Sequence, residues 1–317
     1  MERNIDKMKK KLLFANKHSF TKEMFESLNG LDVEVIYLDG SEQESYNMDF
    51  SDIDAVVCFK FFDFNDISKF KSLKFIHTTS TGIDQMPLKY IDENGIILKN
   101  CPGVHSAPIS EYVIGAVLSI YKKFDKLKKQ QEKHIWECDW NLHEMINRRV
   151  CILGTGSIGS HCAKRFRAFD TVVAGVDPYP KNDGSFSEVY KMDKMLDEIA
   201  KADIVVNCIP LFENTYHLID KKCFDVMKDD AVFINVTRGG VVDFEALIET
   251  LESGRLMGAA ADVFEQEPLP EDSRFWDVER LIITPHNSFA GEGNAERIFG
   301  CIYNDLKEWL ETEKLLH

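Results

Sequence analysis

Short apolar runs alternate with amphipathic stretches along the whole chain. Runs of this kind, rich in β-branched residues, are typical of strands buried on both faces, and helical patterns between them are typical of parallel sheets with crossover helices. A first series ends near Asn100 and comprises KLLFAN, VEVIYL, DAVVCF, KFIHTT and GIILKN. A second series comprises RRVCILG, TVVAGVD, DIVVNCIP, AVFINV, MGAAADV and LIITPH. The pattern therefore predicts two α/β sheets.

The two series are joined by the segment ISEYVIGAVLSIYKKFDKLKKQQE, residues 109–132. Its apolar residues recur at spacings of four and three, which predicts one long helix. The residues with this spacing are Val113, Val117, Ile120, Phe124 and Leu127. After the second series, a loop and a last amphipathic helix that ends at about Leu310 are expected.

The chain has 317 residues, more than the ~100–200 residues of an ordinary domain, so two domains are expected. The longest uncharged apolar stretch, YVIGAVLSIY, is far shorter than the ~20 residues that a membrane helix requires. The basic start, MERNIDKMKKK, lacks the apolar core and the cleavage site of a signal peptide. We therefore expect a cytoplasmic protein without a membrane partner.

The formal net charge of −15 opposes binding to phosphate backbones and to anionic membranes, so no nucleic-acid partner is expected. The eight cysteines include no C-x-x-C pair and fall mostly in apolar runs, as free buried thiols do. We therefore expect neither a disulfide framework nor a zinc site.

The segment CILGTGSIG places Gly154, Gly156 and Gly159 in the spacing G-x-G-x-x-G, between a predicted strand and a predicted helix. The next strand, TVVAGVD, ends at Asp177, which can accept hydrogen bonds from both hydroxyls of an adenosine ribose. Glycines in this context allow backbone contact with a pyrophosphate at the start of the helix. A carboxylate there would repel a 2′-phosphate, so NAD is the expected cofactor and NADP is not.

Polar residues end three further strands of the second series, at the edge where open α/β sheets bind ligands. Arg238 follows AVFINV, Asp262 ends MGAAAD and leads to Glu267, and His286 ends LIITPH. Each alone is equally compatible with a turn or a solvated surface group. Together they suit hydride chemistry on a 2-keto acid. Arginine can hold the carboxylate, histidine can protonate the carbonyl oxygen, and glutamate can keep that histidine charged.

With these motifs the sequence resembles the D-isomer-specific 2-hydroxyacid dehydrogenase family over nearly the whole chain. GTGSIG, NVTRGGVVDFEAL, AAADVFEQEPLP and TPHNS occur in the family's order and at about its spacing. The resemblance implies two Rossmann-like or flavodoxin-like domains with doubly wound parallel sheets and the active-site cleft between them. It implies an NAD-binding domain over residues 103–288 and a discontinuous substrate domain formed by residues 1–102 and 289–317.

The resemblance also implies Arg238 as the residue that orients the substrate, His286 as the acid/base and Glu267 as its partner, with Gly239 and Gly240 leaving room. The loop TSTGID resembles the family's glycine loop, in which Thr81 and Gly82 receive the substrate carboxylate. His105 stands where many members carry asparagine. Further residues assigned to the cofactor site are Ser157, Ile158, Pro210, Thr215, Val236, Thr237 and Asp262.

The expected activity is the NAD-dependent interconversion of a small 2-keto acid and its D-2-hydroxy acid, carried out by a homodimer. One alternative is an NAD-sensing protein similar to a corepressor in the family. Another is a dehydrogenase for a phosphorylated acid, which would need several cations, whereas Lys60 is the only evident candidate. The phenylalanines of CFKFFDF, residues 58–64, either line an apolar pocket or fill the core of the first domain.

Overall fold

The computed structural model describes residues 9–16, 20–38 and 40–315. Most of the basic start discussed above, residues 1–8, lies outside the described residues. The chain divides into two compact units, one formed by Met1–Val104 with Gly291–His317 and the other by His105–Ala290. These divisions lie close to the boundaries expected after residues 102 and 288.

The discontinuous unit contains a parallel five-stranded sheet with the order β2-β1-β3-β4-β5. Every strand predicted in the first series is present. The strands are β1 (Lys10–Phe14), β2 (Val33–Tyr37), β3 (Ala55–Cys58), β4 (Phe75–Thr78) and β5 (Ile97–Lys99). The order reverses next to β1, as in flavodoxin-like folds.

Alternate residues of this sheet enter two separate cores, as the two-residue period of a strand requires. Leu13, Val56 and Ile76 pack on one side together with α2 (Phe61–Phe64) and α3 (Leu88–Glu93). The opposite face packs against α1 (Lys22–Ser27) and the last helix, α10 (Asn294–Leu315). Helices on both faces explain why the strands have near-continuous apolar runs.

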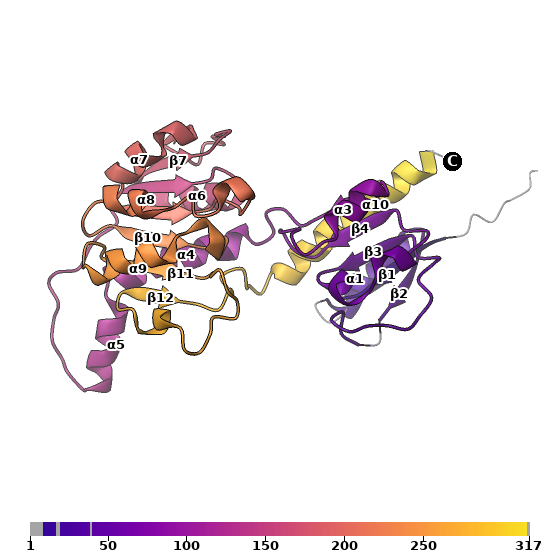
Figure 1. Ribbon diagram of the computed structural model, residues 1–317, viewed down its shortest axis with the longest axis horizontal. Coiled ribbons are helices and arrows are strands. Elements are labelled where there is room, and N and C mark those ends of the chain that lie inside the picture. Colours follow the sequence, from indigo (N-terminus) through magenta and orange to yellow (C-terminus); the bar gives the residue numbers. More distant parts are fainter. Residues whose placement is uncertain (1–8, 17–19, 39, 316–317) are drawn as a thin grey trace, which may run out of the picture. The chain divides into compact units, whose positions relative to one another are not determined.

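The second unit contains a parallel seven-stranded sheet with the order β12-β11-β10-β9-β6-β7-β8, and Figure 1 shows β7, β10, β11 and β12 stacked in this order. Six strands match the predicted series: β6 (Arg149–Leu153), β7 (Val172–Val176), β9 (Ile204–Asn207), β10 (Val232–Asn235), β11 (Gly258–Ala261) and β12 (Leu281–Ile283). The seventh, β8 (Glu188–Tyr190), was not predicted. Its three residues form an edge strand with too few apolar positions for a pattern.

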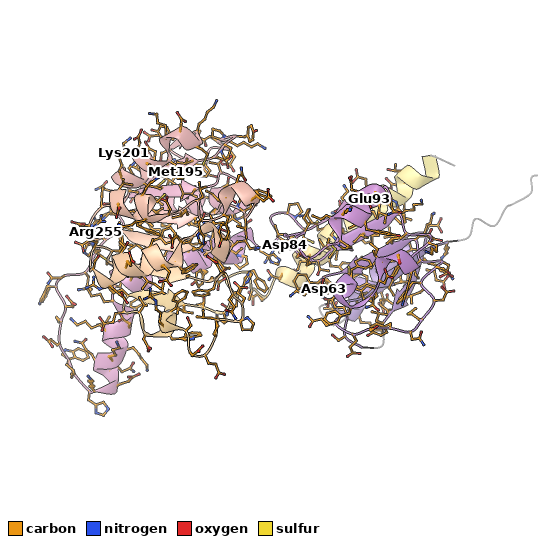
Figure 2. All side chains as sticks on the ribbon, viewed as in Figure 1. Asp63, Asp84, Glu93, Met195, Lys201 and Arg255 are labelled. Carbon is orange, nitrogen blue, oxygen red and sulfur yellow. The ribbon has the colours of Figure 1, made fainter. Side chains whose placement is uncertain are left out.

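Both faces of the seven-stranded sheet are covered. One core contains side chains of α4 (Ser106–Tyr121) and α6 (Ser157–Arg167). The other contains side chains of α7 (Met195–Lys201), α8 (Lys221–Val226) and α9 (Phe244–Glu252). The two end residues of α7 are labelled in Figure 2. Short 3-10 helices occupy Leu28–Gly30, Ile67–Lys69, Met192–Lys194, Glu213–Thr215, Gly239–Val241 and Arg274–Asp277. These two doubly wound parallel sheets confirm the predicted fold class.

The prediction of one long helix over residues 109–132 is wrong. The structure has α4, ending at Tyr121, and then α5 (Phe124–Glu132). Lys123 between them adopts a left-handed conformation with a φ of 50°, which ends α4. The apolar period continues through the break, but no residue of α5 is buried. Figure 1 shows α5 and the segment after it projecting from the rest of the unit.

No helix among the described residues is both long enough and apolar enough to cross a membrane. All eight cysteines lie within the described ranges and are free in the structure. Five of them are buried, Cys208 and Cys301 are partly buried, and Cys138 is exposed.

Candidate active site

The glycine loop follows β6 at the point where the strand order reverses between β6 and β9. Gly154 has a φ of 101°, and a side chain there would lie 2.8 Å from the Cys208 carbonyl oxygen. A Cβ on Gly159 would lie 2.0 Å from the Gly154 carbonyl oxygen. A Cβ on Gly156, the N-cap residue of α6, would have no atom within 4 Å. Two glycines are therefore required for the turn, while the third leaves open space at the start of the helix.

Asp177 lies directly after β7, beside this loop. One oxygen of its carboxylate accepts a hydrogen bond of 2.8 Å from the Thr155 backbone N–H, and the other accepts one of 2.8 Å from the Tyr179 N–H. These bonds fix the carboxylate while each oxygen keeps a further lone pair. The acidic group at the end of this strand is thus held in place to accept additional hydrogen bonds.

The other residues assigned to the cofactor lie around the ends of β9 and β10. The buried hydroxyl of Thr237 donates to the Ile209 carbonyl oxygen at 2.8 Å, which ties these two strand ends together. Val236 belongs to the core on the α4 and α6 face. Pro210 is exposed, and its carbonyl oxygen accepts a bond of 2.8 Å from the Thr215 hydroxyl. Thr237 and Val236 therefore have evident packing roles in the fold itself.

At the start of α6, the hydroxyl of Ser157 lies 2.9 Å from that of Ser106, and Ile158 packs against the core of the same face. Ser157 itself is exposed. Because it occupies the first turn of α6, its backbone N–H is among those that a helix leaves without an intrahelical partner.

Asp262 is fully buried after β11. Its carboxylate lies 2.6 Å from the Thr284 hydroxyl and accepts bonds of 3.0 Å and 2.9 Å from the N–H groups of Asn287 and Ser288. Its carbonyl oxygen accepts a bond of 2.8 Å from the N–H of His286. The residue therefore supports the loop that carries the histidine, a role that the pattern did not reveal because these partners follow a different strand.

His286 and Glu267 form a pair at the edge of the sheet. The Nδ1 atom of His286 lies 2.6 Å from Glu267 Oε2, and the two side chains are 39% and 34% exposed. Glu267 Oε1 accepts a bond of 2.9 Å from the Phe264 N–H. Burial acts to raise the pKa of Glu267, but these hydrogen bonds and the charges of His286 and Arg238 outweigh it, so this pKa lies below its usual value. The carboxylate stays charged beside the ring.

Arg238 directly precedes Gly239, and its guanidinium donates to the Thr237 carbonyl oxygen at 2.9 Å. Its positive charge acts on Glu267, which places the arginine near the dyad. A Cβ on Gly239 would lie 2.0 Å from the carbonyl carbon of Phe264. Gly239 is therefore required because the backbone of the neighbouring segment lies so close to it. The expectation that this glycine leaves room for a ligand gave the wrong reason for its presence.

The sequence did not predict two kinds of contact around the His286–Glu267 pair, one aromatic and one ionic. The ring of Phe289 lies edge-on to His286, with 6.1 Å between centroids, and 5.4 Å from the ring of His105. An apolar side chain three positions after the histidine thus contacts its ring. Glu265, two residues before Glu267, pairs with His217. The Glu265 carboxylate therefore pairs with His217 and not with His286.

The predicted carboxylate-binding loop belongs to the discontinuous unit. The Thr81 hydroxyl donates to the Cys101 carbonyl oxygen at 2.9 Å, and the Asn100 amide donates to the Thr81 carbonyl oxygen at 2.6 Å. The Ser80 hydroxyl donates to the Gly82 carbonyl oxygen at 2.7 Å. These bonds use two carbonyl groups and two hydroxyls of the loop, and they constrain its backbone. Asp84, which follows, is labelled in Figure 2.

The residues of CFKFFDF separate into two groups. Phe61 is fully buried and Phe62 packs against the same core, which favours the core interpretation for these two. Phe64 is 46% exposed. Lys60 is exposed at the start of α2, and its amine lies 5.6 Å from the ring centroid of Phe59.

Comparisons with known proteins agree with the motifs. The model of the D-isomer specific 2-hydroxyacid dehydrogenase, NAD binding domain, matches residues 114–288. The chain is 33% identical over 224 residues to a glyoxylate reductase of Thermofilum pendens, a match that covers 68% of this chain and 65% of the relative. It is 31% identical over 257 residues to a D-2-hydroxyacid dehydrogenase (NAD(+)) of Clostridioides difficile, covering 76% of each.

Among solved structures, a D-isomer specific 2-hydroxyacid dehydrogenase family protein from Aeromonas salmonicida subsp. salmonicida A449 is similar, with a TM-score of 0.82 and 26% identity. The match covers 96% of each chain. The similarity thus extends over both units and confirms the resemblance that the motifs indicated. The chain belongs to the D-isomer specific 2-hydroxyacid dehydrogenase family and contains its NAD-binding domain.

Proposed function

We propose that the protein interconverts a small unphosphorylated 2-keto acid and its D-2-hydroxy acid, with NAD as the cofactor. The observation that carries this proposal is the His286–Glu267 pair, 2.6 Å apart at the sheet edge, with the charge of Arg238 nearby. Bound NADH supplies hydride to C2 of the keto acid. Because Nδ1 of His286 is engaged by Glu267, Nε2 is the atom that gives its proton to the keto oxygen. The guanidinium of Arg238 holds the substrate carboxylate.

We assign the cofactor to the unit formed by residues 105–290 and the substrate domain to the discontinuous unit. The open space at Gly156 and the free first turn of α6 suit a pyrophosphate. Asp177 suits the ribose hydroxyls and disfavours the 2′-phosphate of NADP. Thr81 and Gly82 remain the predicted carboxylate-binding residues of the discontinuous unit.

An unphosphorylated substrate is proposed because a phosphate dianion needs several charge-assisted hydrogen bonds. In the discontinuous unit, the one cation that the motifs place near the predicted loop is Lys60, and its side chain is exposed beside Phe59. The relatives bear the names glyoxylate reductase, D-lactate dehydrogenase and D-3-phosphoglycerate dehydrogenase, so the substrate must be determined directly.

The test compares kcat/KM for glyoxylate, pyruvate, hydroxypyruvate, 2-ketoisocaproate and 3-phosphohydroxypyruvate with NADH, together with chiral analysis of the product. We expect turnover of an unphosphorylated acid to the D-hydroxy acid. His286→Asn should abolish this turnover, while His217→Asn, which changes the other paired histidine of the unit, should retain it. Highest efficiency on the phosphorylated acid, or an L-product, contradicts the substrate assignment. NADH binding without any turnover favours the NAD-sensing alternative.

We further propose that the protein is a homodimer that pairs through the projecting α5 segment. Trp136 and Trp140 on this segment are 98% and 89% exposed, so they do not pack within their own chain. Aromatic residues exposed to this degree are typical of interfaces. Light scattering at micromolar concentration should give a mass near twice the 36.4 kDa of the chain, and the Trp136→Ser/Trp140→Ser variant should dissociate. A wild-type mass near 36.4 kDa refutes the dimer.

A further inference from the structure

Four side chains with metal-binding atoms meet in the discontinuous unit, apart from the proposed active site. His77 lies in β4, Cys101 follows β5, and Cys301 and Asp305 lie one turn apart on α10. A ring nitrogen of His77 and the two sulfur atoms all lie within 4.8 Å of one another. Asp305 Oδ2 lies 3.0 Å from His77 Nε2 and 3.9 Å from Cys301 Sγ. Two thiols and an imidazole thus lie close together, and the Asp305 carboxylate lies beside the imidazole and one of the thiols.

The orientation of the His77 ring independently indicates a ligand atom. The side chain is fully buried, and its Nδ1 lies 3.0 Å from the Thr78 carbonyl oxygen. A carbonyl oxygen only accepts hydrogen bonds, so Nδ1 carries a proton. Histidines that bind metals almost always donate their second N–H to such a group. Nε2 lies 3.0 Å from the Asp305 carboxylate, and a divalent cation bound here would take the place of the proton between these two atoms.

We propose that His77 Nε2, Cys101 Sγ, Cys301 Sγ and an Asp305 oxygen form a tetrahedral site for a borderline-soft divalent cation of the Zn²⁺ class. Zinc binds sulfur at about 2.3 Å and imidazole nitrogen at about 2.0–2.1 Å, so ligand atoms in a site lie about 3–4 Å apart. The observed spacings require only small inward rotations of side chains. This proposal concerns binding alone and does not rest on the proposed catalytic function.

The charges around the cluster suit such a cation. Two thiolates and a carboxylate carry three negative charges against two positive charges on the metal, and Lys99 adds one more positive charge. Its amine lies 3.8 Å from the other oxygen of Asp305. Lys99 also lies 3.6 Å from Glu308, so it offsets only part of the remaining negative charge of the site. The thiol protons that the metal displaces make long contacts, from Cys101 to the Thr78 carbonyl at 3.6 Å and from Cys301 to the Asn100 carbonyl at 3.6 Å and to Asp305 at 3.9 Å.

The cluster also supports the predicted carboxylate-binding loop. Cys101 donates its backbone N–H to the Ser80 carbonyl oxygen at 3.0 Å and accepts the Thr81 hydroxyl at 2.9 Å. A cation that joins Cys101 to β4 and α10 would fix the loop from beneath. The chain lacks a C-x-x-C pair, and the expectation of no zinc site rested on that spacing. Only the fold brings these distant residues together.

The test uses the full-length chain, reduced and freed of metal with a chelator that is then removed, with Zn²⁺ added in a calorimetric titration. We expect one equivalent to bind. Co²⁺ should give thiolate-to-metal charge transfer and the strong visible bands of tetrahedral coordination. Cys301→Ser should weaken zinc binding by about 100-fold or more and remove the charge-transfer band, and Asp305→Asn should weaken it by about 10–100-fold.

Cys138→Ser, which removes an exposed thiol, is the matched control and should bind like the wild type. Circular dichroism of each variant checks that it is folded. If Cys301→Ser does not fold, zinc binding by Asp305→Asn supplies a second test. No zinc uptake by the reduced protein, or equal uptake by both cysteine variants, overturns the proposal. Reoxidation to a Cys101–Cys301 disulfide in a protein that binds no zinc also overturns it and assigns the cluster to thiol chemistry.

Discussion

Glu267→Gln is the substitution that most directly tests the proposed acid/base pair. Glutamine has the same shape and can still accept the Phe264 N–H through its oxygen, so the loop keeps its 2.9 Å bond. The amide nitrogen then faces Nδ1 of His286 in place of Oε2, and the negative charge is lost. Without that charge the protonated ring is less favourable. Keto-acid reduction, which consumes the proton, should therefore lose activity at a lower pH than in the wild type.

The size of this effect follows from the geometry. The Nδ1–Oε2 distance of 2.6 Å places the centres of the two charges about 4 Å apart. Two unit charges at that separation attract by about 4 kcal/mol at an effective dielectric constant of 20 and by about 1 kcal/mol in water. Since both side chains are more than one third exposed, solvent screening reduces the upper figure to about 1–3 kcal/mol. The alkaline limb of the reduction profile should therefore move to lower pH.

The assay is the pH dependence of kcat/KM in both directions. Reduction requires the protonated ring and oxidation of the hydroxy acid requires the neutral ring, so both limbs should move toward lower pH. Activity in oxidation would then extend further into acid. Because the pKa of Glu267 lies below its usual value, the wild-type carboxylate remains charged over this range. Glu265→Gln, whose carboxylate pairs with His217, is the control and should leave the profiles in place. Profiles that do not move in Glu267→Gln, or that move equally in both variants, refute the assignment.

Four further substitutions test the rest of the proposed site. Asp177→Ala should narrow a preference for NADH over NADPH, because it removes both the contact with the ribose hydroxyls and the repulsion of the 2′-phosphate. Equal wild-type kcat/KM values with the two cofactors would contradict that preference. Gly159→Ala should prevent stable folding or lower the melting temperature sharply, because its Cβ would lie 2.0 Å from a carbonyl oxygen. Gly156→Ala should fold normally and weaken NADH binding. Equal melting temperatures of the two variants would contradict this interpretation of the loop. Arg238→Lys should lower kcat/KM by about tenfold or more, since lysine lacks the planar fork that binds a carboxylate, and an unchanged value would remove Arg238 from the substrate site.

The central strands of both sheets were predictable because they are buried on two faces and are therefore apolar over most of their length. This signal fails where burial fails. At the edge strand β8, Glu188 is exposed and the strand is only three residues long. The helical period that runs through Lys123 indicated one helix, but α5 buries no side chain, so its apolar residues face outward. Periodicity records which residues share a face and does not tell what that face contacts.

The candidate site residues could be proposed from the sequence because Arg238, Asp262 and His286 follow strands at one edge of the sheet, but the contacts that hold them in place could not. Gly239 is explained by the backbone of Phe264, and Asp262 by the N–H groups of Asn287 and Ser288. These are contacts between segments that follow different strands, and no spacing within one segment encodes them. The cluster of His77 and the two cysteines was missed for the same reason.

These supports have a consequence for how the proposed acid/base group works. His286 has a φ of 49°, a backbone conformation that is unfavourable for a residue with a side chain. The hydrogen bond from its backbone N–H to the Asp262 carbonyl oxygen holds it in this conformation. Asp262 fixes the residues that follow, and Glu267 fixes the ring from the side. The imidazole is therefore positioned before any substrate binds, so little reorganisation remains for the proton-transfer step.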